Sequence, residues 1–344
     1  MFDALIIGGG LAGWAGGHAL VRAGFRAAII ERVQPALPAI GEHLPPQGVQ
    51  ALHRLGLGDL LLDPAHRPSP GLTMAWGEAA SATRSYLGQP GGRAFHLDRG
   101  AFQAAMRQRA LAAGLMRLQG GVTSLDGGPG AWRVAGPGFA IEARLLVDAT
   151  GRPALVGRRL GARVARDDAL TGLAARLPFT GSGMALRLEA MASGWWYAAP
   201  LTGQRLIAVA LTDADLLPQG VGARLSWWRA EAFSAGLIRA MAPEIPEVSL
   251  RSVAAWSQRL VPSAGPGWLA LGDAAMAFDP LASAGMTKAL NDAADLPSLL
   301  REEFDPVPLE AMRQRRYAEY RAQLARTYAG EPRFAAAPFW QRRL

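Results

Sequence analysis

The 344-residue chain contains no cysteine and a single lysine, Lys288. The missing cysteine excludes disulfides, thiol catalysis and cysteine-bound metals. No uninterrupted apolar run reaches the roughly 20 residues that span a bilayer. The first strand-like run begins at residue 3, which leaves no room for a signal peptide. We therefore expect a cytoplasmic protein without a transmembrane segment. The 50% hydrophobic composition is enough for a sizeable core, in one large or two interleaved domains.

The N-terminal residues follow the pattern of a dinucleotide-binding turn. An apolar, strand-like run over 4–7 leads into Gly8, Gly10 and Gly13, and helix-like residues follow. Gly8 permits the tight turn, Gly10 the approach of a pyrophosphate, and Gly13 the close packing of helix on strand. The start of the helix offers free N–H groups to phosphates. Glu31 ends the second strand, where its carboxylate can accept hydrogen bonds from a ribose.

The rest of the chain shows two patterns. Helical spacing predicts helices over 47–62, 101–113, 225–241, 285–300 and 309–328. Between 170 and 212, short strands separated by turns indicate an antiparallel sheet, and 252–259 reads as a further strand. The predicted class is α/β, with a Rossmann-like nucleotide domain interleaved with an antiparallel sheet domain. The expected boundaries are 1–70, 93–165 and 262–305 for the nucleotide domain, 71–92 and 166–261 for the sheet domain, and 306–344 for a C-terminal helical basic tail.

Two later segments complete a three-part pattern. The run 148–152 follows one buried strand, Gly272-Asp273 follows another, and Pro280 and Gly285 come shortly after. In this order the segments resemble the flavoprotein monooxygenases that share their fold with para-hydroxybenzoate hydroxylase, and equally the flavin-dependent halogenases and geranylgeranyl-reductase-type enzymes. The resemblance covers nearly the whole chain and implies a glutathione-reductase-type FAD-binding domain. The alternative interpretation is that Asp273 merely caps a helix.

The resemblance implies FAD as cofactor, with Asp273 bonded to its ribityl or pyrophosphate portion. The 280–286 segment would present N–H groups at a helix start to the pyrimidine edge of the flavin. Arg99 matches an arginine that contacts FAD phosphate or adenine, and Val122 falls where related chains touch adenine. The expected cofactor-binding residues are Gly8, Gly10, Leu11, Ala12, Gly13, Glu31, Arg32, His43, Leu44, Arg99, Val122, Asp273, Pro280, Gly285 and Met286.

The segment 41–46 matches in position the strap that halogenases place beside the flavin. That strap reads Gly-Glu-Ser, and here His43 replaces the serine. Alone, His43 could be an ordinary loop histidine, but its place on the strap makes it, with Glu42, the candidate acid/base. The other histidines show no ligand spacing with carboxylates, so no metal site is expected.

The run 194–200 resembles the aromatic strand that family members place next to the isoalloxazine. The expected substrate-binding residues are Trp195, Trp196, Tyr197 and Pro200, although these rings could equally belong to the core. Flavin halogenases position hypohalous acid with a lysine in the tract after the strap, and 47–93 contains none. Arginine is a poor substitute because of its delocalised charge and high pKa. Hydroxylation is therefore favoured over halogenation.

Within the superfamily, the chain most resembles flavoproteins that modify tryptophan during tryptophylquinone cofactor maturation. The resembling pieces are 73–77, 95–99, 194–197, 212–215, 277–281 and 339–343. The resemblance implies a monooxygenase that uses NAD(P)H or another reductant together with O₂. Oxygen would pass from a flavin C4a-hydroperoxide to an electron-rich ring, namely a tryptophan of a partner protein.

The last 34 residues are strongly basic. Eight arginines stand against Glu319 and Glu331, a net charge of +6 out of the chain's +8. This region is either a docking face for an acidic protein substrate or a solvated helix in an arginine-rich chain. No nucleic-acid partner is expected. The rival functions are a small-molecule aromatic hydroxylase, a flavin-dependent halogenase or alkene reductase, and a non-catalytic FAD-binding maturation chaperone.

Overall fold

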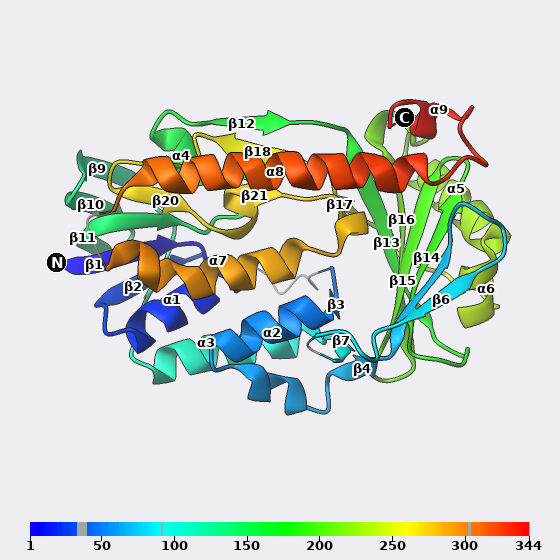
Figure 1. Cartoon of the computed structure of the whole chain (residues 1–344), viewed down its shortest axis with the longest axis horizontal. Helices are drawn as coiled ribbons and strands as arrows, with labels where there is room; N and C mark the ends of the chain where they lie inside the picture. The colour runs from blue at the N-terminus through cyan, green and yellow to red at the C-terminus, as the bar shows by residue number, and fades with distance from the viewer. Residues whose placement is uncertain (33–39, 91, 302–303, 344) are drawn as a thin grey trace.

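A computed structural model describes residues 1–32, 40–90, 92–301 and 304–343. Two large sheets lie at opposite ends of the long axis, and helix α8 (Pro306–Ala329) runs along both (Figure 1). The chain passes between the sheets several times, which confirms the predicted α/β class with an interleaved antiparallel sheet. No helix among the described residues is long and apolar enough to cross a membrane, and the cellular location stays a prediction.

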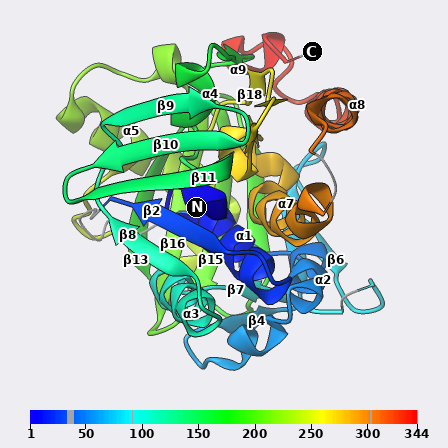
Figure 2. The ribbon, with the colours of Figure 1, turned by 90° about the vertical axis from the view of Figure 1, so that its left-hand side faces the viewer.

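The first sheet has eight strands, with β1 at its centre. Strand β1 pairs in parallel with β2 and β11, and β11 pairs in parallel with β20. Helices α1, α3 and α7 pack against one side, as the end-on view in Figure 2 shows. Residues 4–7 of β1 form a continuous apolar run because both faces of the strand are covered there. The elements are β1 (Phe2–Ile7), β2 (Ala27–Glu31), β8 (Met116–Gln119), β9 (Ser124–Gly128), β10 (Ala131–Gly136), β11 (Phe139–Asp148), β19 (Ala264–Gly265), β20 (Trp268–Ala270), α1 (Leu11–Arg22), α3 (Arg99–Ala112) and α7 (Gly285–Leu300).

The second sheet has seven strands in the order β17-β13-β16-β15-β14-β5-β6. All its pairs are antiparallel except β14 with β5. Helices α5 and α6 cover its outer face, where Trp196 and Trp228 share a buried cluster. The elements are β5 (Gly71–Ala75), β6 (Ala82–Ser85), β13 (Leu170–Pro178), β14 (Leu186–Met191), β15 (Gly194–Leu201), β16 (Arg205–Asp213), β17 (Arg251–Ala254), α5 (Val221–Ser234) and α6 (Gly236–Met241).

Two three-stranded sheets join the large ones. Strands β12, β18 and β21 lie between them beside α8, and β3, β7 and β4 form a small sheet near α2 (Figure 1). The remaining elements are β3 (His43–Leu44), β4 (Arg67–Ser69), β7 (Ala94–His96), β12 (Arg163–Arg166), β18 (Gln258–Val261), β21 (Met276–Ala277), α2 (Pro46–Arg54), α4 (Leu155–Arg159) and α9 (Pro338–Gln341).

Three predicted elements were wrong in extent. The expected helix over 225–241 is two helices, because Ala235 adopts an extended conformation with φ −76° and ψ 112°. The expected strand over 252–259 is two strands in different sheets, β17 and β18. The expected helix over 47–62 ends at Arg54 and is followed by a separate 3₁₀ turn over Gly58–Leu62. Local patterning therefore located these elements but not their breaks.

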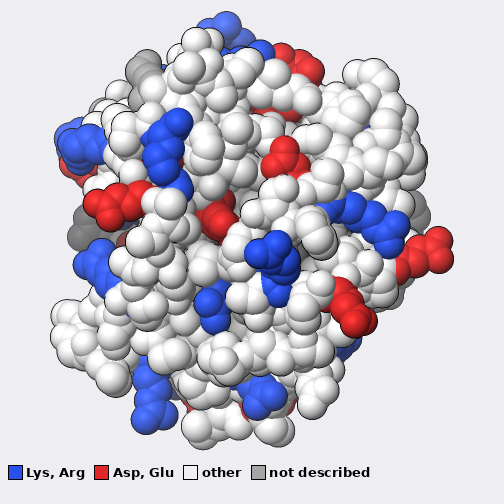
Figure 3. Space-filling view, turned by 90° about the vertical axis from the view of Figure 1, so that its right-hand side faces the viewer, with Lys and Arg blue, Asp and Glu red and all other residues white. Residues whose placement is uncertain are grey.

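Most of the positive charge of the C-terminal tail is used inside the molecule. Six of its eight arginines bind acidic side chains or backbone carbonyls of the chain: Arg313, Arg316, Arg321, Arg333, Arg342 and Arg343. Arg315 and Arg326 are exposed. On the face shown in Figure 3, positive and negative side chains are scattered singly among neutral ones. The expectation of a strongly basic docking face is therefore reduced to two exposed arginines on α8.

Candidate active site

The fingerprint turn between β1 and α1 leaves no room for a side chain at Gly8 or Gly13. Gly8 has φ +117°, and a Cβ there would lie 2.2 Å from the Ala149 carbonyl oxygen. A Cβ on Gly13 would lie 1.9 Å from the carbonyl oxygen of Gly8, whereas one on Gly10 would meet open space. Helix α1 begins at Leu11, and its N-cap residue, Gly10, has no side chain to cap it. Its first N–H groups therefore remain available to an anion.

A cavity of about 360 Å³, the central cavity, opens at this turn. The three segments singled out from the sequence all contribute to its wall, together with the strap and β15. Its lining includes Gly10, Leu11, Ala12, Ile40, Gly41, His43, Arg99, Gly151, Arg152, Tyr197, Ala254, Asp273, Phe278, Asp279, Pro280, Ser283, Gly285 and Met286. Residues more than 270 positions apart in the sequence thus meet at one site.

Asp273 lies among cations at this cavity. Arg99, Arg152 and Lys288 each interact electrostatically with its carboxylate. Arg99 Nη1 donates a 2.6 Å hydrogen bond to the Gly41 carbonyl, while its Nε has no partner among the described residues. Buried polar groups normally have partners. An unpartnered guanidinium nitrogen on the wall of a cavity is therefore suited to a polar ligand.

The strap places two titratable side chains near β7 and the loop after β6. Burial raises the pKa of Glu42, and its Oε1 has no hydrogen-bond partner among the described residues. Burial and the neighbouring His96 hold the pKa of His43 well below its ordinary value. His43 Nε2 lies 3.1 Å from the Tyr86 hydroxyl, and its ring centroid lies 5.2 Å from that of His96. His43 is therefore a neutral imidazole at neutral pH.

Strand β15 divides the predicted substrate residues between the two faces of its sheet. Tyr197 lines the central cavity, and its hydroxyl accepts a 3.2 Å hydrogen bond from the backbone N–H of His43. Trp195 shares this face but is fully buried against Trp76 and bonded to Tyr328. Trp196 packs on Trp228 at the opposite face, where alternation also places Pro200. The expectation that all four residues meet one substrate is corrected: only Tyr197 reaches the cavity.

The remaining predicted cofactor residues lie outside the cavity wall, toward the first sheet. A Cβ on Gly9 would lie 2.1 Å from Glu31 Oε2, so this carboxylate lies directly at the fingerprint turn. Arg32 lies beside Gly121, and the Val122 carbonyl accepts a 3.4 Å hydrogen bond from Arg159. Leu44 is buried in the core. Glu31, Arg32 and Val122 lie on the side of the fingerprint turn toward which the ribose and adenine of a dinucleotide would extend. Their role in binding FAD stays a prediction.

Several residues that line the central cavity were not among the predicted site residues. Arg152, Phe278 and Asp279 belong to the segments 148–152 and 273–286, so their place at the cavity could have been predicted from the sequence. Asp148, by contrast, accepts hydrogen bonds from Thr150 and Gly157, so it supports its own turn. Tyr86 and His96 approach His43 from distant positions, and no spacing in the sequence indicates that contact.

The residues present fit FAD. An uncapped helix start and an open Gly10 suit a pyrophosphate, and Glu31 suits a ribose. Helix α7 also starts without a side-chain cap, at Ala284 beside the cavity, which leaves N–H groups for an electron-rich edge. The residues that would hold FAD therefore come from the fingerprint turn, the strap, Arg99 and the 273–286 segment.

The chain has curated and structural relatives. LodB of Marinomonas mediterranea, described as an FAD-dependent oxidoreductase, is 27% identical over 99% of this chain and 96% of that protein. The structure of the peptidyl tryptophan dihydroxylase QhpG, essential for tryptophylquinone cofactor biogenesis, is similar with a TM-score of 0.80 and 24% identity, over 99% of this chain and 78% of that one. The flavin-dependent halogenase CmlS has a TM-score of 0.83 and 25% identity, over 99% of this chain and 67% of that one.

The family comparison covers most of the chain. The profile of the tryptophan halogenase family matches residues 74–343. The matched region contains β15, the 273–286 segment and α8, which build much of the central cavity and its surroundings. The chain therefore belongs to the tryptophan halogenase family and is an FAD-dependent oxidoreductase.

Proposed function

We propose that the chain is an FAD-dependent monooxygenase that hydroxylates an electron-rich aromatic ring, a tryptophan of a partner protein. The reductant is NAD(P)H or another two-electron donor, and the oxidant is O₂. When bound, FAD supplies the activation of dioxygen. The protein then has to hold the ring near the flavin, exclude water and manage protons.

One observation carries the choice of hydroxylation over halogenation. The side chain of the chain's only lysine, Lys288, is 3% exposed on α7, with its Nζ 3.6 Å from Asp292 Oδ2. The strap wall of the cavity instead carries imidazole and phenol groups. A halogenase mechanism that needs an amine beside the flavin has no residue for it there. Halogenation remains the second candidate because the family profile and CmlS favour it.

The strap residues have definable tasks in hydroxylation. His43 is neutral, and in the tautomer whose Nε2–H donates to the Tyr86 hydroxyl, its Nδ1, which has no partner among the described residues, can accept one proton. The free Oε1 of Glu42 can hold a proton or orient a donor. Tyr197 anchors the strap to β15 through the N–H of His43. An indole ring needs no phenolate activation, so a modest acid/base group is sufficient.

The choice of a protein substrate is supported by QhpG, whose substrate is a peptidyl tryptophan. An acidic partner docking on the outer face of α8 would meet Arg315 and Arg326, the exposed arginines of that helix. The large share of both chains that is covered means that the whole architecture, and not one motif, is common to this chain and these relatives.

The test is intact-mass spectrometry of an unmodified precursor of a tryptophylquinone protein, incubated with this protein, FAD, NAD(P)H, O₂ and bromide. We expect a mass gain of one or two oxygen atoms, located on tryptophan by fragmentation. A bromine gain would instead establish the halogenase. Unchanged mass with FAD bound would overturn the proposal.

A matched pair of variants examines the strap. His43→Gln removes the buried imidazole, whereas His53→Gln changes an exposed histidine on α2. We expect oxygenation to fall at least tenfold in the first and to stay unchanged in the second. Equal rates in both would exclude His43 from the reaction.

A further inference from the structure

Asp279 stands between two cavities. On one side it lines the central cavity, and on the other it lines a second cavity of about 830 Å³, the α8 cavity. It is the single residue common to the two described linings, and it is 2% exposed. The rim of the α8 cavity carries Arg321 and Arg342, whose side chains are 42% and 43% exposed. The second cavity therefore leads toward solvent on the α8 side.

Hydrogen bonds fix the Asp279 carboxyl group on the wall between the cavities. Its Oδ2 accepts a 2.6 Å bond from the Tyr328 hydroxyl, and its Oδ1 accepts a 2.8 Å bond from the Leu281 N–H. Tyr328 in turn accepts a 3.1 Å bond from Trp195 Nε1. The backbone N–H of Asp279 donates to the Tyr320 hydroxyl. Helix α8 thus holds this residue from two turns, and Tyr328 itself lines the α8 cavity.

The proposed reaction consumes a proton. Insertion of one oxygen atom converts substrate, O₂, a hydride donor and one proton into hydroxylated substrate, water and oxidised donor. A site that excludes bulk water must still admit that proton. Among the described residues, His43 and Tyr197 line the central cavity but not the α8 cavity. Asp279 lines both.

We propose that Asp279 is the proton inlet of the site, carrying protons from water in the α8 cavity to the central cavity. The carboxylate takes one proton from water on the α8 side and releases it on the flavin side, so it ends each cycle unchanged. No electron moves through it. The inference rests on the proposed function for the proton that oxygen insertion consumes, and its test uses flavin reduced by electrons alone, which takes up one proton from solution.

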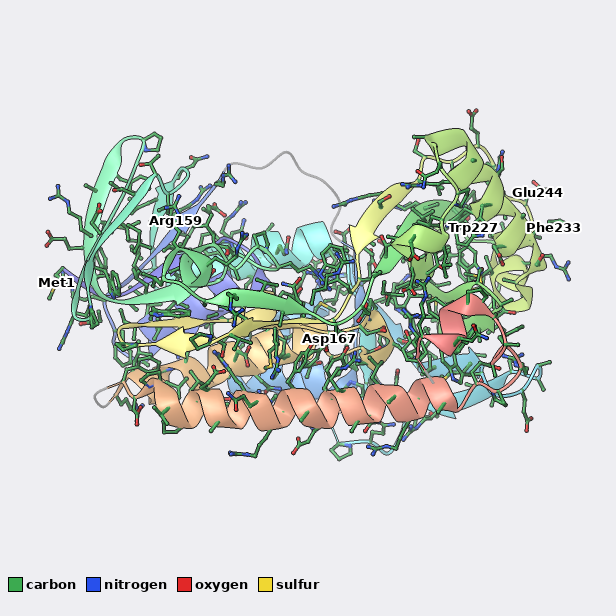
Figure 4. The ribbon with its side chains drawn as sticks, turned by 90° about the horizontal axis from the view of Figure 1, so that it is seen from above. Met1, Arg159, Asp167, Trp227, Phe233 and Glu244 are labelled. Atoms are coloured by element: carbon green, nitrogen blue, oxygen red, sulfur yellow. The ribbon has the colours of Figure 1, made fainter. Side chains whose placement is uncertain are left out.

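The charges around Asp279 suit this task. Burial raises its pKa to about 6, Tyr328 and Arg343 act to lower it, and Asp168 acts to raise it. The group can therefore exchange a proton near neutral pH. The titratable and charged groups that line the two cavities around it are Arg166, Asp167, Asp168, Asp213, Arg321, Tyr328, Arg342 and Arg343 on the α8 side, and His43, Arg99, Arg152, Tyr197 and Asp273 on the other. Asp167 lies beside α8, between the two ends of the molecule (Figure 4).

A purely structural role would give a different result. Asp279 also caps the short turn over Pro280–Ala282, which adjoins the expected flavin contacts. Asp279→Asn keeps an acceptor for the Leu281 N–H and a similar shape but cannot carry a proton. Flavin fluorescence measures how much FAD each protein binds, and uptake is compared at saturating FAD, so that a loss of cofactor or of folded protein is not read as a loss of proton transfer.

The test follows proton uptake while bound FAD is photoreduced by an added electron donor whose oxidation releases no proton, in weakly buffered solution containing a pH-indicator dye, without substrate. In the wild type we expect uptake to keep pace with flavin bleaching. In Asp279→Asn we expect uptake to lag at least tenfold, with recovery on addition of formate as a small diffusible acid. Uptake at the wild-type rate in Asp279→Asn would overturn the proposal, even if the partner protein is oxygenated normally.

Two neighbouring substitutions sharpen the test because they act in opposite directions. Tyr328→Phe removes a donor that lowers the pKa of Asp279, so the pH midpoint of the uptake rate should rise. Asp168→Asn removes a charge that raises this pKa, so the midpoint should fall. Asp167→Asn, in the same cavity, serves as the control with an unchanged midpoint. Shifts of the two midpoints in the same direction would contradict the assignment.

Discussion

The central cavity has two sides that can be compared: the strap wall, which carries His43, and the α8 wall, which carries Asp279 held by tyrosines of α8. Each places a titratable group against a tyrosine hydroxyl. On the strap, His43 pairs with Tyr86, and on the α8 side Asp279 pairs with Tyr328. Burial favours the neutral form of each. For the histidine this means that the proton is lost well before neutral pH, whereas for the carboxyl it means that the proton is held up to about pH 6.

The two walls also differ in how firmly they are packed. Tyr86 is half-buried in the loop after β6, while Tyr328 is 2% exposed amid Trp76, Phe339 and Trp340. The strap is joined to β15 through the Tyr197 hydroxyl, which accepts from the His43 N–H. The comparison indicates that the α8 wall supplies rigidity and a group able to change charge, while the strap supplies neutral hydrogen-bonding groups close to the ligand.

The largest difference between the walls should appear in unfolding. Tyr328→Ala leaves a cavity inside an aromatic cluster and should cost about 3–5 kcal/mol. Tyr86→Ala truncates a half-buried ring and should cost about 1 kcal/mol. Urea unfolding of both variants measures the difference. Similar losses would show that the strap is packed as firmly as the α8 wall.

The second expected effect is an opposite dependence of stability on pH. Burial lowers the pKa of His96 from 6.5 to about 4, so its stabilising contribution is present above 6.5 and is lost as the pH falls toward 4. The pKa of Asp279 is raised from 3.8 to about 6, so its contribution is present below 3.8 and is lost as the pH rises through 6. Each is at most about 3 kcal/mol.

Variants separate these two opposing contributions. When the pH falls from 7 to 4.5, protonation of Asp279 stabilises the wild type, so Asp279→Asn, which lacks this gain, should lose more free energy of unfolding than the wild type. Over the same change, the buried His96 destabilises the wild type, so His96→Gln should lose less. Denaturant midpoints at the two pH values provide the measurement. Changes of the same sign in both variants would show that the walls do not differ in this way.

A smaller effect tests the two faces of β15. Tyr197→Phe removes the acceptor of the His43 N–H, a net loss of about 1 kcal/mol, and should weaken FAD binding about fivefold. Trp196→Phe on the opposite face is the control and should leave FAD affinity unchanged, because Trp196 contacts Trp228 instead of the cavity. Fluorescence titration with FAD measures both. Weaker binding in the control would place the outer face within the site.

The smallest effect is expected on the outer face of α8. The double substitution Arg315→Gln and Arg326→Gln changes exposed side chains and should alter stability by less than about 0.5 kcal/mol. Arg313→Gln, in contrast, removes a buried guanidinium that donates to the Ala270 and Ser263 carbonyls and should cost about 2 kcal/mol or more. Chemical unfolding compares the pair. Equal costs would mean that the buried bonds contribute little.

Much of the fold could be predicted from the sequence because its signals are local. The strand before Gly8, the fingerprint spacing and the buried runs before Asp148 and Asp273 are periodic patterns that span only a few residues. The breaks at Ala235 and between β17 and β18 could not be predicted, because packing against the second sheet decides them. In β15, the alternation of side chains predicts that Trp195 and Trp196 lie on opposite faces of the sheet. It does not predict which of the two faces lies toward the cavity, because that depends on packing.

The sequence by itself determined the class of the protein: a nucleotide-binding turn, the two later loops that meet it, the absence of cysteine and the single lysine. The tertiary structure alone decided which side chains share the cavity. It brought Tyr86 to His43 across 43 positions and Tyr328 to Asp279 across 49, and it paired most of the tail arginines internally. The reason is physical: backbone patterns depend on near neighbours, whereas pairs of polar side chains form only where packing removes both from water.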